Sequence, residues 1–341
     1  MRPPSISVVI PARDASPTLE RTLAALRAQE CTEPYEVIVV DDGSRDDTAG
    51  IARRHEQFAK LVHFERSQGP GAARNHGVSS AAAPVLAFTD ADCFPHPMWL
   101  AHGLEALAHA DIVQGAVRPE PAVTRTPFDR TVAVERGEGF YETANLFVKR
   151  ELFDRVGGFR DWAMERRGRR FAEDRRRDRA TRTPIGEDTL FAWSARRLGA
   201  RTVYAPTALV FHAVVPGTLR DAIADRWHWT RDMPGLAQLV PELRDAIFYR
   251  RWFFAYWTAT FDLAVLSLAA LTLTRRRWCL VGLFPYIRRV YHEATVYRAM
   301  PGTAWERARS AAMYALGAPA VDAATLAGLV VGSIAWRCIV L

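Results

Sequence analysis

The chain of 341 residues has few cysteines and almost no lysine. Its cysteines lie far apart, without the close pairs that a zinc ribbon or a disulfide framework needs, so we expect reduced thiols and a reducing compartment. Arginine supplies nearly all of the 45 basic residues and of the net charge of +7, because only Lys60 and Lys149 are lysines. Such a charge is compatible with phosphate ligands, an anionic membrane surface or nucleic acid.

The N-terminus also lacks a secretory signal. Residues 1–11 do not contain the apolar stretch of about 7 to 15 residues that such a signal needs, so we expect the N-terminal part to stay in the cytosol. Hydrophobic residues make up 49% and charged residues 24% of the chain, which excludes disorder for most of it.

Residues 5–117 alternate between short β-branched runs and helical periodicity. This pattern predicts an α/β fold, a mostly parallel sheet flanked by helices. Ser16 is the expected N-cap of the first helix, with Pro17 at its first position. We expect an α/β domain at 1–235 and a hydrophobic helical region at 236–341. The predicted strands are 5–10, 35–40, 61–64, 85–88 and 112–117. Residues 161–183 are charge-dense and are predicted to form a mobile surface insertion or a solvated helix.

Two apolar runs near the C-terminus are long enough to span a bilayer. They cover residues 252–274 and 311–336, with Asp262 and Asp322 as their only charges. Arginines at 275–277 would lie on the outer side of a two-span topology, against the positive-inside tendency, so a shallow hairpin or interfacial helices stay open. We predict membrane association; the alternative is a buried helical domain of a soluble protein.

Polar clusters follow three of the predicted strands, at residues 11–13, 41–44 and 89–92. In open α/β sheets ligands bind beyond the carboxyl ends of strands, so these clusters are expected to converge on one crevice. The alternative for each cluster is an ordinary turn. Asp90 and Asp92 are spaced to aim two carboxylates at one hard cation, Mg²⁺ or Mn²⁺.

The order of these motifs resembles the family 2 glycosyltransferases, which have a GT-A-type, Rossmann-like fold. The resemblance covers about residues 5–215, and it implies a nucleotide-sugar donor, a divalent cation and transfer with inversion. The matching segments are Val8-Val9-Ile10-Pro11, Val39-Val40-Asp41-Asp42-Gly43-Ser44, Gly69 to Gly77, Asp90-Ala91-Asp92 and Gly186-Glu187-Asp188.

The resemblance also implies roles for single residues. Asp188 is expected to be the catalytic base and Glu187 to orient the acceptor or that base. Asp92, Asp90 and His212 are the expected metal ligands, while Asn145 is expected to line the acceptor site. The expected nucleotide-sugar site comprises Pro11, Arg13, Asp41, Asp42, Gly71, Arg74, Asp90 and Ala91.

Simpler roles stay open for some of these side chains. Glu187 and Asp188 could stabilise the N-terminus of a helix at 189–198. His212 could be a packed, hydrogen-bonded residue, and Arg13 could form a surface ion pair. The chain also departs from the processive synthases of the family, because residues 225–227 are only Asp-Arg-Trp where those enzymes have Gln-x-x-Arg-Trp. We therefore expect a non-processive enzyme.

The predicted function is a metal-dependent inverting glycosyltransferase at the cytoplasmic face of the cell membrane. Its expected acceptor is a lipid-linked or cell-envelope glycan, with a polyprenyl phosphate as the alternative. A nucleic-acid-binding module would explain the arginines but not the strand-end carboxylates, which repel phosphates, so nucleic acid is not an expected partner. A catalytically silent membrane scaffold is the third hypothesis.

Overall fold

The computed structural model describes residues 2–121, 123, 125–137, 139–162, 186–298, 300 and 302–341. The chain forms two compact units, Met1–Pro121 with Thr131–Ala213, and Ala122–Arg130 with Val214–Leu341. The domain boundary predicted at 235 falls inside helix α8 (Leu219–Leu239), which belongs to the second unit because it packs along α12 (Ala304–Trp336). Of the predicted insertion at 161–183, only residues 161 and 162 are described.

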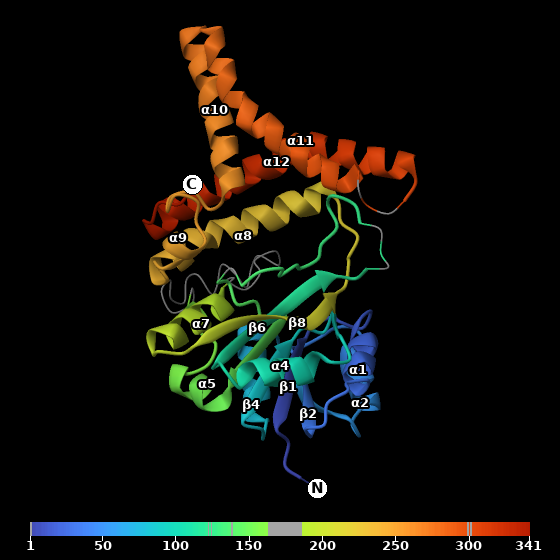
Figure 1. The fold of residues 1–341 in the computed structure, drawn as a ribbon. Helices are drawn as coiled ribbons and strands as arrows, with labels where there is room; N and C mark the ends of the chain where they lie inside the picture. The colour runs from blue at the N-terminus through green and yellow to red at the C-terminus, as the bar shows by residue number, and fades with distance from the viewer. Residues whose placement is uncertain are drawn as a thin grey trace. The chain divides into compact units, whose positions relative to one another are not determined.

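The first unit is built on a mixed sheet that has eight strands among the described residues, in the order β3-β2-β1-β4-β7-β6-β8-β5 (Figure 1). Four strand pairings are parallel and three, β4–β7, β6–β7 and β5–β8, are antiparallel. The predicted α/β class is confirmed. The strands are β1 Ile6–Ala12, β2 Tyr35–Asp41, β3 Ala59–His63, β4 Val85–Thr89, β5 Cys93–Pro95, β6 Ile112–Pro119, β7 Asn145–Lys149 and β8 Thr202–His212.

Helices cover both faces of this sheet. Alternate residues of β2 lie in different clusters: Val37 and Val39 pack with the residues of α1 and α4, whereas Ile38 and Val40 pack with Ala73 of α3. A strand buried on both faces is an unbroken apolar run, which is why β1 and β2 could be predicted. The helices of this unit include α1 Leu19–Arg27, α2 Thr48–Arg54, α3 Pro70–Ser79, α4 Trp99–Leu107, α5 Arg150–Val156 and α7 Glu187–Arg197.

Helix α1 begins later than predicted. Its N-cap position is Thr18, not Ser16, and the backbone N–H of Ser16 instead donates to Oδ2 of Asp46 at 2.9 Å. The side chains of Leu19, Leu23 and Leu26 are buried on one face, as the periodicity predicted.

The second unit is helical. Helices α8 and α12 approach closely because a Cβ on Gly328 would lie 2.2 Å from Oγ1 of Thr230, and one on Gly332 would lie 2.3 Å from the carbonyl oxygen of Arg231. Buried Asp322 of α12 accepts hydrogen bonds from Tyr286 and Arg289. The other elements are α9 Leu243–Ala246, α10 Tyr256–Thr274, the 3-10 helix η1 Arg277–Leu283 and α11 Phe284–Arg298.

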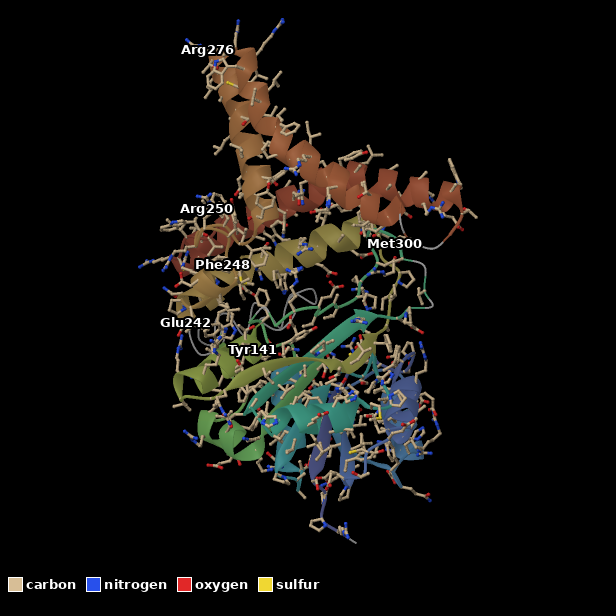
Figure 2. All side chains as sticks on the ribbon, in the orientation of Figure 1. Tyr141, Glu242, Phe248, Arg250, Arg276 and Met300 are labelled. Carbon is tan, nitrogen blue, oxygen red and sulfur yellow. The ribbon has the colours of Figure 1, made fainter. Side chains whose placement is uncertain are left out.

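Helices α10 and α12 are long and apolar enough to cross a membrane. Large apolar side chains of this unit lie on its surface: Leu273, Val281 and Leu316 are each more than 70% exposed. Figure 2 shows Arg276 at the far end of the hairpin that α10 forms with the following segment.

Candidate active site

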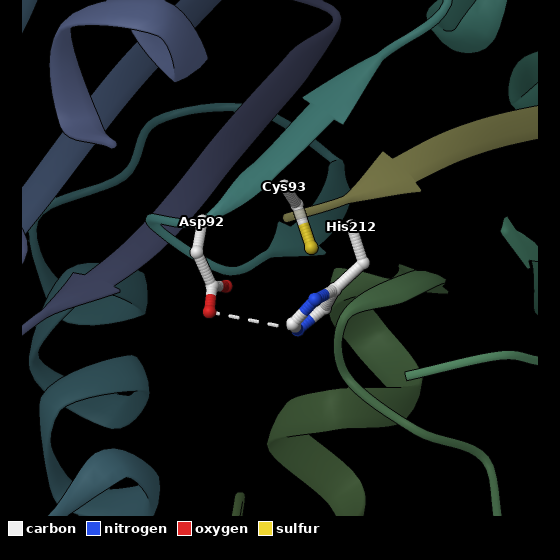
Figure 3. Close-up of side chains that lie close together, drawn as sticks. All are labelled: Asp92, Cys93 and His212. Atoms are coloured by element: carbon white, nitrogen blue, oxygen red, sulfur yellow. Dashed lines mark ion pairs between the residues drawn. The ribbon is translucent and has the colours of Figure 1, made fainter. Parts of the chain in front are cut away.

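Asp90 and Asp92 lie in a turn between β4 and β5, closed by a hydrogen bond from the N–H of Cys93 to the carbonyl oxygen of Asp90 (3.1 Å). Strand β5 pairs with β8 so that Cys93 stands opposite His212. The pairing brings Oδ2 of Asp92 to 3.5 Å from Nε2 of His212. A carboxylate oxygen of Asp92, the sulfur of Cys93 and a ring nitrogen of His212 all lie within 4.8 Å of one another (Figure 3). The structure thus brings together two predicted metal ligands from distant parts of the chain.

The chemistry of this cluster fits a divalent cation. Burial raises the pKa of Asp92; His212 opposes that shift, and the charge of Asp90 adds to it. A bound cation would relieve this repulsion, and carboxylate oxygen and imidazole nitrogen are suitable ligands for it. Helix α1 holds this turn in place, because the carbonyl oxygen of Ala91 accepts a hydrogen bond from Thr22 Oγ1 at 2.8 Å. The roles of Asp90 and Ala91 in donor binding stay predictions.

Arg74 on α3 joins the metal side of the site to α7. Its Nη2 donates to Oδ1 of Asp90 at 2.8 Å and its Nη1 to Oε1 of Glu187 at 3.2 Å. The side chain is only 6% exposed. Burial would lower the pKa of Arg74, but the charges of Asp90 and Glu187 outweigh it, so the guanidinium stays charged. Both hydrogen-bond partners of Arg74, Asp90 and Glu187, are carboxylates of the site. The expected contact of Arg74 with a diphosphate stays a prediction.

Glu187 and Asp188 occupy the first turn of α7, immediately after Gly186, whose φ of 90° is in the left-handed region. Oδ1 of Asp188 accepts from the N–H of Thr189 (2.8 Å) and Oδ2 from that of Thr143 (3.3 Å). Negative charge at a helix N-terminus is favourable, so the structural role predicted for this pair is compatible with a catalytic one.

The two acidic side chains of this turn are shifted towards their protonated forms. Burial, with the charge of Glu142, raises the pKa of Asp188 to about 6, and Arg74 opposes the shift. Burial and the charge of Asp188 raise the pKa of Glu187 to about 7. A carboxylate with a pKa near 6 is still mostly ionised at neutral pH and accepts a proton more readily than an ordinary aspartate does.

Asp41 and Asp42, at the end of β2, are occupied by hydrogen bonds within the chain. Asp41 is fully buried and accepts from the N–H of Ser44 (3.0 Å) and from Nδ1 of His63 (2.7 Å). Asp42 accepts from Ser67 Oγ (2.7 Å) and from the backbone N–H groups of residues 68 (2.6 Å) and 69 (3.0 Å). Contact of these carboxylates with a base or ribose stays a prediction.

Other predicted residues lie around this edge of the sheet. Pro11 is within β1 near its end, and Nη1 of Arg13 donates to Ser67 Oγ at 2.8 Å. Gly71 leaves room for the acidic turn, because a Cβ there would lie 3.3 Å from Cγ of Glu187. Their contacts with a donor likewise stay predictions.

Asn145 does not line an acceptor site, so that expectation is wrong. The residue is fully buried; its Oδ1 accepts from Trp99 Nε1 (2.8 Å), and its Nδ2 donates to the carbonyl oxygens of Ala116 and Ala208 (2.8 and 2.7 Å). The Asn145 amide therefore connects β7 to α4, β6 and β8. Sequence analysis missed Glu142 and Thr143, which lie beside Asp188; the short segment before β7 gave no periodic pattern that could reveal them.

Comparison with known families identifies the chain. The family described as glycosyl transferase family group 2 matches residues 86–291, and glycosyl transferase family 2 matches residues 7–161. The first match covers more than half of the sequence, and the chain belongs to the family 2 glycosyltransferases.

Individual relatives agree with this assignment. The chain is 33% identical over 171 residues to glycosyltransferase AglE of Haloferax volcanii, covering 46% of this chain and 56% of that protein. It is 31% identical over 238 residues to the pre-mycofactocin glycosyltransferase of Mycobacterium tuberculosis, covering 62% and 44%. The chain thus spans about half the length of these curated relatives.

A solved structure supports the fold. The mannosyltransferase PcManGT of Pyrobaculum calidifontis, in complex with GDP-Man and Mn²⁺, aligns with a TM-score of 0.54 at 21% identity, over 99% of this chain and 88% of that one. The predicted GT-A-type fold is confirmed.

Proposed function

We propose that the protein transfers a sugar, with inversion, from a nucleoside-diphosphate sugar to a hydroxyl acceptor, using Mg²⁺ or Mn²⁺. The observation that carries this proposal is the bridge made by Arg74. One guanidinium contacts Asp90, beside the candidate metal ligands, and Glu187, beside the candidate base, at 2.8 and 3.2 Å. The groups that must act on the leaving group and on the attacking hydroxyl therefore belong to one connected site.

Each side of the site has a distinct chemical task. Asp188 would take the proton of the acceptor hydroxyl, and its raised pKa suits that task. Asp92 and His212, with Asp90 beside them, would hold the cation, which when bound offsets the charge that develops on the departing diphosphate. Arg74 and Glu187 would keep the two sides in register. A base and a leaving-group site on opposite sides of the sugar give inversion.

Relatives support the donor and the ion. PcManGT was solved with GDP-Man and Mn²⁺, and the TarS fragment 1–349 of S. aureus, which aligns with a TM-score of 0.50 at 17% identity, was solved with UDP-GlcNAc. These structures support a nucleotide-sugar donor here, without selecting the base or the sugar.

The second unit supports a membrane-linked acceptor. Helices α10 and α12 are long enough to span a bilayer, and their exposed apolar side chains are suited to lipid. A groove of about 710 Å³ between α11 and α12 is lined mainly by alkyl and aromatic side chains, with Arg307 as a cation. This groove suits the hydrocarbon chain of a lipid-linked acceptor, with its anionic group near Arg307. We place the enzyme at the cytoplasmic face of the membrane.

The proposal is tested by release of nucleoside diphosphate. The full chain is incubated with Mn²⁺, a lipid extract and, in turn, UDP-, GDP- and dTDP-sugars. We expect one donor class to be consumed only when lipid acceptor and cation are both present, and not by the Asp188→Asn variant. Consumption of no donor, or equal turnover by the variant, would overturn the proposal.

A further inference from the structure

We propose that Cys93 is a third metal ligand, and that the site therefore takes up thiophilic divalent ions, above all Zn²⁺, in competition with Mg²⁺ or Mn²⁺. The inference rests on the metal site of the proposed function. It adds a sulfur ligand, and a choice of ion, that the carboxylate motif does not supply.

The strand pairing puts the sulfur in the right place. Cys93 and His212 are directly opposed residues of the antiparallel pair β5 and β8, so their side chains lie on one face. Asp92 reaches the same point from the preceding turn. Figure 3 shows the Cys93 sulfur beside the His212 ring, to one side of the dashed line that joins the ring to the Asp92 carboxylate.

The spacing of the donor atoms fits a small ion. Zinc bound at about 2.0 to 2.3 Å from tetrahedral ligands separates those ligands by roughly 3.3 to 3.8 Å. Oδ2 of Asp92 and Nε2 of His212 are already 3.5 Å apart. All three donor atoms lie within 4.8 Å, so the sulfur needs to move by only about an ångström to complete a three-ligand set.

The donor chemistry then decides between ions. Mg²⁺ and Mn²⁺ prefer oxygen ligands, whereas sulfur and imidazole together favour Zn²⁺ and its spectroscopic substitute Co²⁺. On coordination the thiol releases its proton to solvent and a metal–sulfur bond forms. A tetrahedral ion held by these three residues would leave one position for water or a phosphate oxygen. A buried cysteine that binds no metal acts as a small apolar side chain. In that role Cys93 would not alter the relative affinities of the site for Zn²⁺ and Mn²⁺.

Co²⁺ provides a direct reading of the sulfur ligand. The full chain, freed of metal with a chelator, is titrated with Co²⁺ while near-ultraviolet absorption is recorded, and Co²⁺, Zn²⁺ and Mn²⁺ binding is measured by calorimetry. We expect a sulfur-to-cobalt charge-transfer band that Zn²⁺ abolishes. In Cys93→Ser the band should disappear and Zn²⁺ should bind about tenfold more weakly or worse, with Mn²⁺ binding changed less than about twofold. Cys31→Ser, which alters a half-buried cysteine outside the cluster, is the matched control and should behave as wild type.

The outcomes separate this inference from the metal site itself. Co²⁺ bound without the band in the wild type, or a band retained in Cys93→Ser, overturns the sulfur ligand while the metal site stands. If the wild type binds neither Mn²⁺ nor Co²⁺, with or without a nucleotide sugar, both proposals fall. Cys93→Ala repeats the measurement if the serine variant does not fold.

Discussion

The ends of β2 and β4 carry two similar pairs of aspartates with opposite surroundings. Asp41 and Asp42 are at most 3% exposed, and their oxygens accept hydrogen bonds from the chain itself. The side chains of Asp90 and Asp92 are 30% and 38% exposed and face Arg74 and His212. The same strand-end pattern thus gives a loop anchor in one place and an open acidic edge in the other.

The difference comes from the loops that follow each strand. Gly43, with φ of 68°, lets residues 66–69 close over the first pair, because a Cβ there would lie only 2.7 Å from the N of Ser67. The turn at Asp90 leads directly into β5 and leaves its carboxylates accessible. A strand-end carboxylate is therefore available to a ligand only where no nearby loop supplies enough N–H groups to satisfy it.

The largest effect is expected from neutralising Asp188, the carboxylate proposed as base. Asp188→Asn should lower kcat by about 10²- to 10⁴-fold, because general-base assistance contributes that much. Donor affinity should stay nearly unchanged, since the amide keeps the shape of the side chain. Steady-state kinetics and calorimetry check both parts, and unaltered turnover would remove Asp188 from this role.

Asp92→Asn tests the more exposed pair, Asp90 and Asp92, at the end of β4. Loss of a carboxylate ligand should weaken Mn²⁺ binding by about 10- to 100-fold. Removing a residue that only supports a metal ligand already weakens metal binding by that much. Asp42→Asn should leave Mn²⁺ affinity unchanged. Calorimetric titration of both variants with Mn²⁺ measures the two affinities. If Asp42→Asn weakens Mn²⁺ binding as much as Asp92→Asn does, the contrast between the two aspartate pairs is wrong.

The free energy of unfolding should show the opposite order, with Asp42→Asn more destabilising than Asp92→Asn. In Asp42→Asn the amide replaces one acceptor oxygen, which leaves a buried backbone N–H of the 68–69 loop without its partner. The free energy of unfolding should fall by about 1 to 3 kcal/mol. Asp92→Asn, without the metal, should change it little. Chemical denaturation of both variants gives the result; a larger loss in Asp92→Asn contradicts the anchor role.

The smallest expected effect is the pH dependence. A base must be unprotonated, so activity should fall as the pH drops through the pKa of about 6 of Asp188, and rise above it. Between pH 7 and pH 5 the ionised fraction falls about tenfold. A pH profile of kcat/KM at saturating Mn²⁺ measures this limb; a flat profile across the interval would count against Asp188.

Much of the fold follows from local pattern. Strands β1, β2 and β4 are mostly apolar runs, and the order of the motifs after them predicted the sheet edge that holds the site. Strands β5, β7 and β8 were not predicted. Strand β5 has only three residues, too few for a clear period.

The site itself was only partly accessible to sequence analysis. Asp92 and His212 were named correctly as neighbours because a family resemblance supplied the link, but the place of Cys93 beside them depends on the pairing of β5 with β8. The donors that satisfy Asp42 come from residues 67–69, more than twenty positions later, and no local pattern announces that contact.

The most direct test of the central claim is calorimetric titration of the full chain with its nucleotide-sugar donor, with and without Mn²⁺. We predict that the wild type needs Mn²⁺ for tight donor binding, and that Asp92→Asn binds the donor weakly in either condition. Equally tight donor binding without Mn²⁺, or in Asp92→Asn, would contradict the proposal that the acidic edge after β4 holds the ion on which donor binding depends.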